Sequence, residues 1–164
     1  MHRISFLLFL ALGSAAAVQP ALAESPAQTG HPEARVFDDR ADAAAEVDAA
    51  LALAQQSGKR VMLVLGANWC HDSRGLAGWF AEPRFAAMLD AKYERVNVDV
   101  GYKDRNLAIA PRFGIAEIKG TPTVLVLSPE GQLLNRKSAP KWRNAASREP
   151  DDIFAYFDQF TPEP

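Results

Sequence analysis

The residues best suited to chemistry are a tryptophan, a cysteine, a histidine, an aspartate and a serine in direct succession, at positions 69–73. Cys70 is the only cysteine in the 164 residues. A thiolate is a strong nucleophile, and it is favoured where a cysteine lies at a helix N-terminus. An apolar run over residues 61–65 precedes this stretch, and a helical pattern follows it. We therefore predict that Cys70 is an exposed thiol at a strand-to-helix junction.

The neighbours of Cys70 have several candidate roles. His71 could pair with the thiolate, assist proton transfer, ligate a metal together with Cys70, or be an ordinary solvated histidine. Asp72 could cap the helix, and Ser73 could cap it or hydrogen-bond the thiolate. Trp69 is either a platform beside the thiol or a core side chain. The residue types alone leave these alternatives open.

The sequence favours no resident metal and no resident cofactor. Zinc sites normally collect four ligands, and an adjacent pair such as Cys70 and His71 is a weak signal. The remaining histidines, His2 and His31, lie in the segments that we expect to be a signal peptide and a leader. We therefore predict no metal site, and the only small molecule we expect is an external thiol.

The N-terminus has the layout of an export signal. A short basic start is followed by an apolar stretch over residues 4–18 and a small-x-small ending at residue 23. The stretch is short for a membrane span, which needs about 20 apolar residues, although an uncleaved anchor is the alternative. We expect a signal peptide (1–23), a flexible leader poor in apolar residues (24–35), and one domain (36–164). The mature protein would be periplasmic or secreted, with no stable membrane insertion.

Charge and cysteine content exclude some partners and crosslinks. The formal net charge is −2 and the isoelectric point is near 5.9, so nothing favours nucleic-acid binding. A late basic cluster over residues 136–148 is interspersed with polar residues, and we interpret it as a solvated loop. Export places the domain where disulfides form. One cysteine cannot make an internal disulfide, so Cys70 is not a structural crosslink.

Hydrophobic periodicity predicts an α/β fold with helices on both faces of a central sheet. We expect Asp38 or Asp39 to cap the first helix. Pro83 should begin a renewed helix after an interruption, and Pro111 should end a short one. The predicted helices cover residues 41–56, 73–80, 82–91, 104–110 and 150–160, the strands cover 60–66 and 93–100, residues 124–134 form a hairpin, and 135–149 form a polar loop.

Two motifs in this order resemble the thioredoxin superfamily. Residues 69–73 resemble its Trp-Cys-x-x-Cys active site, and Thr121-Pro122 resembles the cis-proline segment that faces that site. Residues 96–99 resemble the intervening strand. The similarity extends over residues 36–160, and the interrupted helix after the site is most similar to the exported thioredoxin-7-type branch. The resemblance implies a thioredoxin-like fold with a central mixed sheet.

The resemblance also implies roles, and the departures from it limit them. Cys70 would be the attacking thiol, and Pro122 would be cis, presenting the Thr121 backbone to an extended client chain. Ser73 replaces the second cysteine, which resolves the mixed disulfide in two-cysteine relatives, and Val64 replaces a buried acid. A dithiol cycle is therefore unavailable to this chain alone. Turnover would need an outside thiol such as glutathione, or would be an isomerisation without net redox change.

The leading hypothesis is an exported monothiol protein that performs thiol-disulfide exchange through Cys70. His71 and Ser73 would assist the thiolate, and Trp69 and the Thr121-Pro122 segment would contact the client. Its partners would be a cysteine-containing client protein or a thiol donor. The alternatives are a non-catalytic binding module, a redox sensor in which Cys70 is oxidised to sulfenic acid, and metal handling through Cys70 and His71.

Overall fold

A mixed three-stranded sheet forms the centre of the protein, in a computed structural model that describes residues 30–161. The strands are β1 (Arg60–Gly66), β2 (Tyr93–Asp99) and β3 (Thr123–Leu127), in the order β2-β1-β3. β1 pairs in parallel with β2 and antiparallel with β3. All seven residues of β1 are buried, because this central strand is covered on both faces. The predicted fold class is confirmed.

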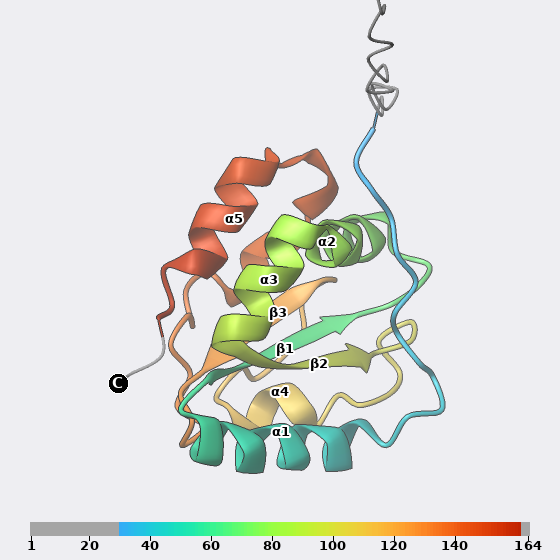
Figure 1. The fold of residues 1–164 in the computed structure, drawn as a ribbon. Coiled ribbons are helices and arrows are strands. Elements are labelled where there is room, and N and C mark those ends of the chain that lie inside the picture. The colour runs from blue at the N-terminus through green and yellow to red at the C-terminus, as the bar shows by residue number, and fades with distance from the viewer. Residues whose placement is uncertain (1–29, 162–164) are drawn as a thin grey trace, which may run out of the picture.

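Helices cover both faces of the sheet (Figure 1). On one face lie α1 (Ala43–Ser57) and α4 (Ile109–Arg112); on the other lie α2 (His71–Ala81), α3 (Pro83–Lys92) and α5 (Pro150–Asp158). Side chains of β1 alternate between two cores, with Leu63 packed beneath α1 and Met62 packed toward α3 and α5. Burying one such side chain is worth about 2 kcal/mol. β1 is therefore held firmly, and the site that follows its end has a rigid base.

Local sequence explains how the helices begin and end. The N-cap of α1 is Asp42, whose carboxylate accepts the Ala45 amide at 3.1 Å. The prediction of Asp38 or Asp39 as the cap is wrong, because the N-cap lies four residues after Asp38 and three after Asp39. Pro83 occupies the first turn of α3, where its missing N–H is not needed, as predicted.

The segment between β2 and β3 differs from its prediction. Residues 104–108 are not helical, because positive φ angles at Lys103 (66°) and Asn106 (53°) are incompatible with a continuous helix. The short helix α4 begins only at Ile109, and it contains Pro111 rather than ending before it. Proline is tolerated there because the first turn of a helix has no partner for that N–H.

The predicted hairpin after β3 is reduced to one bridge, between Leu127 and Leu133. The side chain of Asn135 takes the place of a longer partner strand. It accepts the Val126 amide at 2.9 Å and donates to the Val124 carbonyl at 2.8 Å. Sequence periodicity cannot reveal such a side-chain substitute for a strand.

Residues 135–149 are more than the polar loop that we predicted. They form two 3-10 helices, η1 (Ala139–Trp142) and η2 (Ala145–Ser147). Trp142 is buried against α5, with its ring centroid 4.6 Å from that of Phe157. Three small or aromatic residues among many polar ones carry this packing, so the average polarity of the segment was misleading.

The N-terminal predictions are only partly within the described residues. The predicted signal peptide and residues 24–29 of the predicted leader lie outside them. Residues 31–35 of that leader lie against α2, where the Ala34 amide donates to the Arg74 carbonyl at 3.0 Å (Figure 1). These contacts are mostly polar, so the low apolar content of the leader did not predict them. Among the described residues, no helix has the length and apolarity needed to cross a membrane.

Candidate thiol site

Cys70 lies where the chain passes from β1 into α2, as predicted. It is the N-cap residue of α2, in extended geometry, and its amide donates to the Ala67 carbonyl at 3.1 Å. Its Sγ lies 3.4 Å from the carbonyl oxygen of Thr121, and the Thr121–Pro122 peptide bond is cis. The thiol is only 8% exposed, so the prediction of an exposed thiol is wrong. The polar residues that follow Cys70 are exposed or engaged elsewhere, whereas the segment before β3 lies against the sulfur.

Ser73 supports the turn that carries Cys70. Its side chain is fully buried, and its Oγ accepts the Ala67 amide at 3.5 Å. A Cβ on Gly66 would lie 2.9 Å from this oxygen and 2.5 Å from the ring of Phe37, so only glycine fits there. The hydrogen bond of Ser73 is therefore made to the backbone of the turn, whereas we predicted one to the helix N-terminus or to the thiolate.

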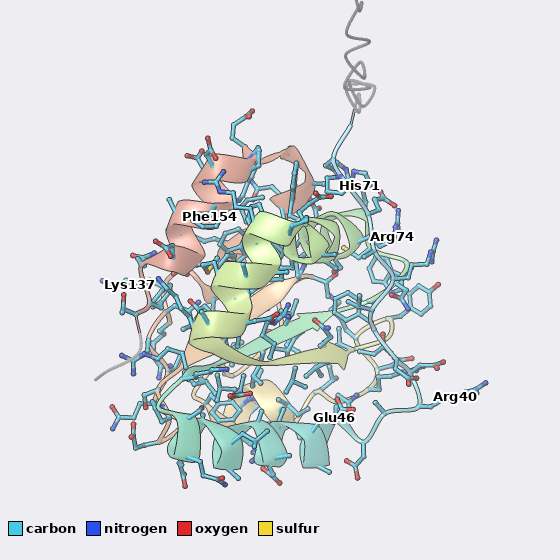
Figure 2. The ribbon with its side chains drawn as sticks, in the orientation of Figure 1. Arg40, Glu46, His71, Arg74, Lys137 and Phe154 are labelled. Carbon is cyan, nitrogen blue, oxygen red and sulfur yellow. The ribbon has the colours of Figure 1, made fainter. Side chains whose placement is uncertain are left out.

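His71 is directed toward the leader. Its Nδ1 lies 3.1 Å from a carboxylate oxygen of Glu33, and its Nε2 lies 2.9 Å from Nε2 of His31. The side chain is 62% exposed. Figure 2 shows His71 on the side of α2 along which the leader runs. Both ring nitrogens thus have partners other than Cys70, which argues against the predicted contact with the thiolate.

Asp72 does not cap α2. Its carboxylate accepts the amide of Ala146 at 2.9 Å and so ties the helix to η2. Within the described part of the chain, the N-cap of α2 makes no side-chain capping hydrogen bond to the first-turn amides. Unpaired amides at a helix N-terminus favour an anion close by. The cap that we predicted from Asp72 or Ser73 is thus absent, and this leaves the N-terminus available to a thiolate at Cys70.

Arg74 is a residue of the site that the sequence analysis missed. Its guanidinium donates to the carbonyls of Asn68 and Trp69, at 3.1 and 3.0 Å, and so braces the turn before Cys70. It also pairs with Glu33 at 2.8 Å. The hydrogen bond with Glu33, together with attraction to Glu33 and to the Cys70 sulfur, raises the pKa of Arg74. The sequence signal that could have identified Arg74 is a basic residue one turn into the helix that follows Cys70.

Trp69 is a surface side chain, which decides between its two predicted roles. Its indole is 48% exposed, and its N–H donates to the Gly101 carbonyl at 2.8 Å. The ring stacks on Tyr102 with centroids 5.3 Å apart and planes inclined by 5°. Tyr102 is 76% exposed and was not predicted. Together the two rings form an aromatic surface beside the thiol, which we call the Trp69–Tyr102 pair.

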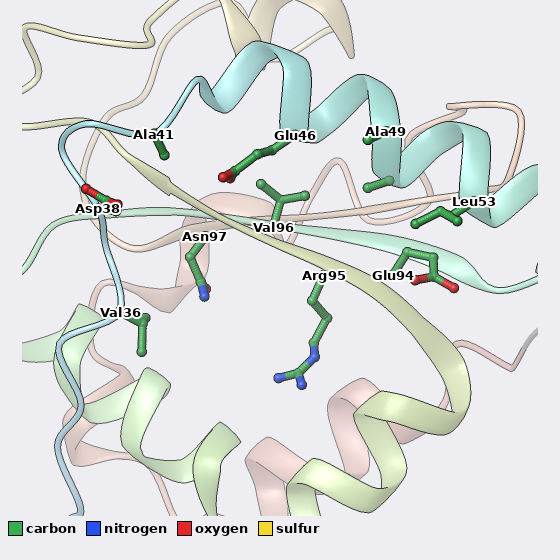
Figure 3. Close-up of a pocket in the computed structure, with 11 residues that line it drawn as sticks. Val36, Asp38, Ala41, Glu46, Ala49, Leu53, Glu94, Arg95, Val96 and Asn97 are labelled. Carbon is green, nitrogen blue, oxygen red and sulfur yellow. The ribbon is translucent and has the colours of Figure 1, made fainter.

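A hollow of about 410 Å³ elsewhere has none of the features of a thiol site. It lies between α1, the start of the folded chain and the edge strand β2 (Figure 3). Arg95 and Asn97 project to one side of β2 there, and Val96 projects toward α1. The residues around it include no cysteine or histidine, so we place the candidate site at Cys70.

Comparisons with known proteins agree with this geometry. Residues 42–129 match a family model described as thioredoxin-like, which is more than half of the chain. The chain belongs to the thioredoxin-like family. A solved structure described as a disulphide isomerase from Xylella fastidiosa Temecula1 has 31% sequence identity and a TM-score of 0.72, over 77% of this chain and 96% of that one.

A second thioredoxin-like structure supports the fold alone. It is the C-terminal domain of DsbD from Neisseria meningitidis in the oxidised form, with 21% identity and a TM-score of 0.50. The match covers 77% of this chain and 99% of that domain. No curated protein sequence matches the chain.

Within the described residues, the thioredoxin-like site of this chain has a single cysteine, and the apolar Val64 stands where the resemblance implies a buried acid. Val64 is buried among apolar side chains, and Ser73 occupies the position three residues after Cys70. The only cysteine within the described residues is Cys70. The arrangement can therefore supply an attacking sulfur, a braced turn and a carbonyl facing that sulfur.

Proposed function

We propose that this protein is an exported monothiol catalyst of thiol-disulfide exchange, acting through Cys70. The observation that carries the proposal is the placement of Cys70 at the uncapped N-terminus of α2, with its sulfur 3.4 Å from the Thr121 carbonyl. The likeness to a structure described as a disulphide isomerase adds support. The signal-like sequence of residues 1–23 supports export.

The reaction follows from having one sulfur. The Cys70 thiolate attacks one sulfur of a client disulfide, forming a mixed disulfide and releasing the other client sulfur as a thiolate. A second thiolate of the client then attacks the client sulfur that is bonded to Cys70, and Cys70 leaves as a thiolate. The client has exchanged one disulfide for another, so no electrons are gained or lost. Ser73 cannot compete with this step because a hydroxyl cannot form the internal disulfide.

An outside thiol provides the other exit from the mixed disulfide. Two equivalents of such a thiol would release Cys70, reduce the client and end as their own disulfide. A basic hollow of about 730 Å³, lined by Lys119, Lys141, Arg143 and Arg148 among others, adjoins the site. A Cβ on Gly120, next to Thr121, would lie 2.2 Å from Arg143. This charge favours an anionic thiol such as glutathione.

The client would lie across the Trp69–Tyr102 pair and the Thr121 segment. Exposed aromatic rings bury a large apolar area without losing much conformational freedom. The Thr121 carbonyl accepts from the Cys70 thiol in the structure, so it lies beside the sulfur that any client must approach. The pair thus supplies affinity, and the carbonyl aligns the client chain.

The test is reshuffling of a client protein with scrambled disulfides, in a glutathione buffer. We expect the native protein to speed recovery of the correctly paired client, and Cys70→Ser and Cys70→Ala to do no more than buffer alone. Because Cys70 lies outside both cores, both variants should fold, which circular dichroism checks. Full acceleration by Cys70→Ala would overturn the proposal, because it would show that the thiol is dispensable, as the binding-module alternative requires.

A further inference from the structure

Three potential metal ligands from distant parts of the chain converge beside α2. His31 and Glu33 come from the segment before α1, and His71 is the first residue of α2. Ligand atoms of the three residues all lie within 4.8 Å of one another. We propose that the two histidines bind a divalent transition-metal ion of the kind that imidazole favours, with Zn²⁺ as the expected ion, and that Glu33 supports them. This inference does not rest on the thiol chemistry proposed above.

Hydrogen bonding leaves the two imidazoles in a suitable state for a cation. Nδ1 of His31 lies 3.1 Å from the Pro32 carbonyl, and Nδ1 of His71 lies 3.1 Å from the Glu33 carboxylate. Both oxygens only accept hydrogen bonds, so both Nδ1 atoms must donate. In the neutral rings, both Nε2 atoms therefore carry lone pairs, and these face each other at 2.9 Å. Two facing lone pairs repel unless a proton or a metal ion lies between them.

The geometry needs only a small adjustment to accept a metal. Zinc binds histidine nitrogen at about 2.0–2.1 Å, so two tetrahedral nitrogen ligands lie roughly 3.4 Å apart. The two Nε2 atoms are 2.9 Å apart and would separate by about half an ångström. His71 is on the surface, with its side chain 62% exposed, so it is able to move. Water would complete the coordination, which makes this an open site.

Glu33 is arranged to support His71. One of its oxygens faces His71, and the other pairs with Arg74 at 2.8 Å. A carboxylate that receives the Nδ1–H of a metal-binding histidine fixes the ring and raises its basicity, and losing one typically costs 10–100-fold in affinity. The positive charge of Arg74 opposes a cation, so the affinity will be weaker than that of an all-acidic site. Cys70 takes no part, because its sulfur is buried and faces the Thr121 carbonyl.

Metal binding would fasten the leader to the start of α2. The leader already lies close to the helix, where a Cβ on Gly75 would be 3.0 Å from His31 and one on Gly78 would be 2.3 Å from the Pro32 carbonyl. An ion held by His31 and His71 would join residues that are 40 positions apart in the sequence. The joined segment borders the turn of Cys70.

Calorimetric titration of untagged protein with ZnCl₂ tests the inference. We expect one ion per chain, with affinity reduced at least about tenfold in His31→Ala, in His71→Ala and in Glu33→Gln. Cys70→Ser and Glu82→Gln, a charge-matched control at the end of α2, should bind as the native protein does. Far-ultraviolet circular dichroism of the metal-free variants checks that each one folds.

Three outcomes would overturn the site. These are no heat of zinc binding in the native protein, native affinity in His31→Ala, or loss of binding in Cys70→Ser. The last outcome would indicate a metal held by the thiol, which is a different site. None of these readouts depends on disulfide exchange, so failure of this inference and failure of the proposed function are distinguishable.

Discussion

At the scale of single residues, the site depends on what surrounds one sulfur. The Cys70 sulfur faces the Thr121 carbonyl, an uncapped helix N-terminus lies beside it, and Arg74 braces the preceding turn. Ser73 is close in sequence, yet its Oγ accepts the Ala67 amide. In the proposed mechanism, Cys70 is therefore the nucleophile, Arg74 is a cation that attracts it, and Ser73 holds the turn.

Replacing Arg74 should slow the chemistry of Cys70. We expect Arg74→Gln to reduce the rate of Cys70 alkylation by iodoacetamide at neutral pH by roughly three- to tenfold, because one partly screened charge attraction to the thiolate is lost. Arg74→Lys keeps the charge and loses the planar fork, so it should recover part of the rate. Arg84→Gln, which removes an exposed arginine on α3, is the control. Equal rates in Arg74→Gln and the native protein would show that Arg74 acts on the turn alone.

The sequence predicted which residue lies at the centre of the site better than it predicted the contacts that the site residues make. Cys70 at a strand-to-helix junction followed from the apolar run before it and the helical pattern after it. The partner of His71 did not follow, because His31 lies 40 residues away and approaches only through the path of the leader. The brace from Arg74 and the stacking of Tyr102 on Trp69 were missed for the same reason. Such contacts depend on tertiary geometry that local patterns do not carry.

At the scale of elements, α2 connects the thiol to three other parts of the fold. Its first residue continues the turn from β1, Asp72 binds η2, and the face that carries Gly75 and Gly78 receives the leader. Small residues in α2 make the contact with the leader possible. A Cβ on Gly78 would lie 2.3 Å from the Pro32 carbonyl and 2.6 Å from the Glu33 amide, and backbone atoms cannot easily yield. The glycine therefore sets how closely the leader approaches.

Gly78→Ala should detach the leader. Alanine favours a helix interior by about 1 kcal/mol over glycine, so α2 itself should persist. We expect faster hydrogen exchange at the Ala34 amide, which donates to the Arg74 carbonyl, while the amides of β1 keep their protection. Arg84→Ala, an alanine substitution on the exposed face of α3, is the control. Unchanged exchange at Ala34 in Gly78→Ala would contradict this account of the leader.

Periodicity predicted the regular elements well and the irregular ones poorly. The predicted bounds of β1 match the structure, and those of α1 and α3 are within two residues, because buried strands and amphipathic helices leave strong patterns. The short segments failed where one residue decides the backbone. Examples are the positive φ angles at Lys103 and Asn106, and the side chain of Asn135 that replaces a strand.

At the scale of the whole molecule, charge is distributed unevenly around a slightly acidic protein. The net charge is −2, yet Lys119, Lys141, Arg143 and Arg148 surround one hollow next to the Thr121 segment. No ion pair to an acidic residue engages these four side chains within the described chain. A local positive field of this kind attracts anions and is weakened by salt.

This field should favour an anionic thiol over a neutral one. We expect Lys141→Glu to slow release of Cys70 from a mixed disulfide by glutathione about two- to fivefold at low salt, and to leave release by 2-mercaptoethanol unchanged. The difference should shrink as ionic strength rises. Lys59→Glu makes the same charge change at the opposite end of β1 and should have no effect on either thiol. Equal slowing with both thiols would indicate damage to the site in place of a charge effect.

The central claim is that Cys70 forms a mixed disulfide that Ser73 cannot resolve. The most direct measurement is intact-protein mass spectrometry over time, after glutathione disulfide is added and then removed. We predict that the native protein carries one glutathione that persists without added thiol, that Ser73→Cys loses it and forms an internal disulfide, and that Cys70→Ser never acquires it. A native protein that takes up no glutathione, or a Ser73→Cys adduct as persistent as the native one, would contradict the account.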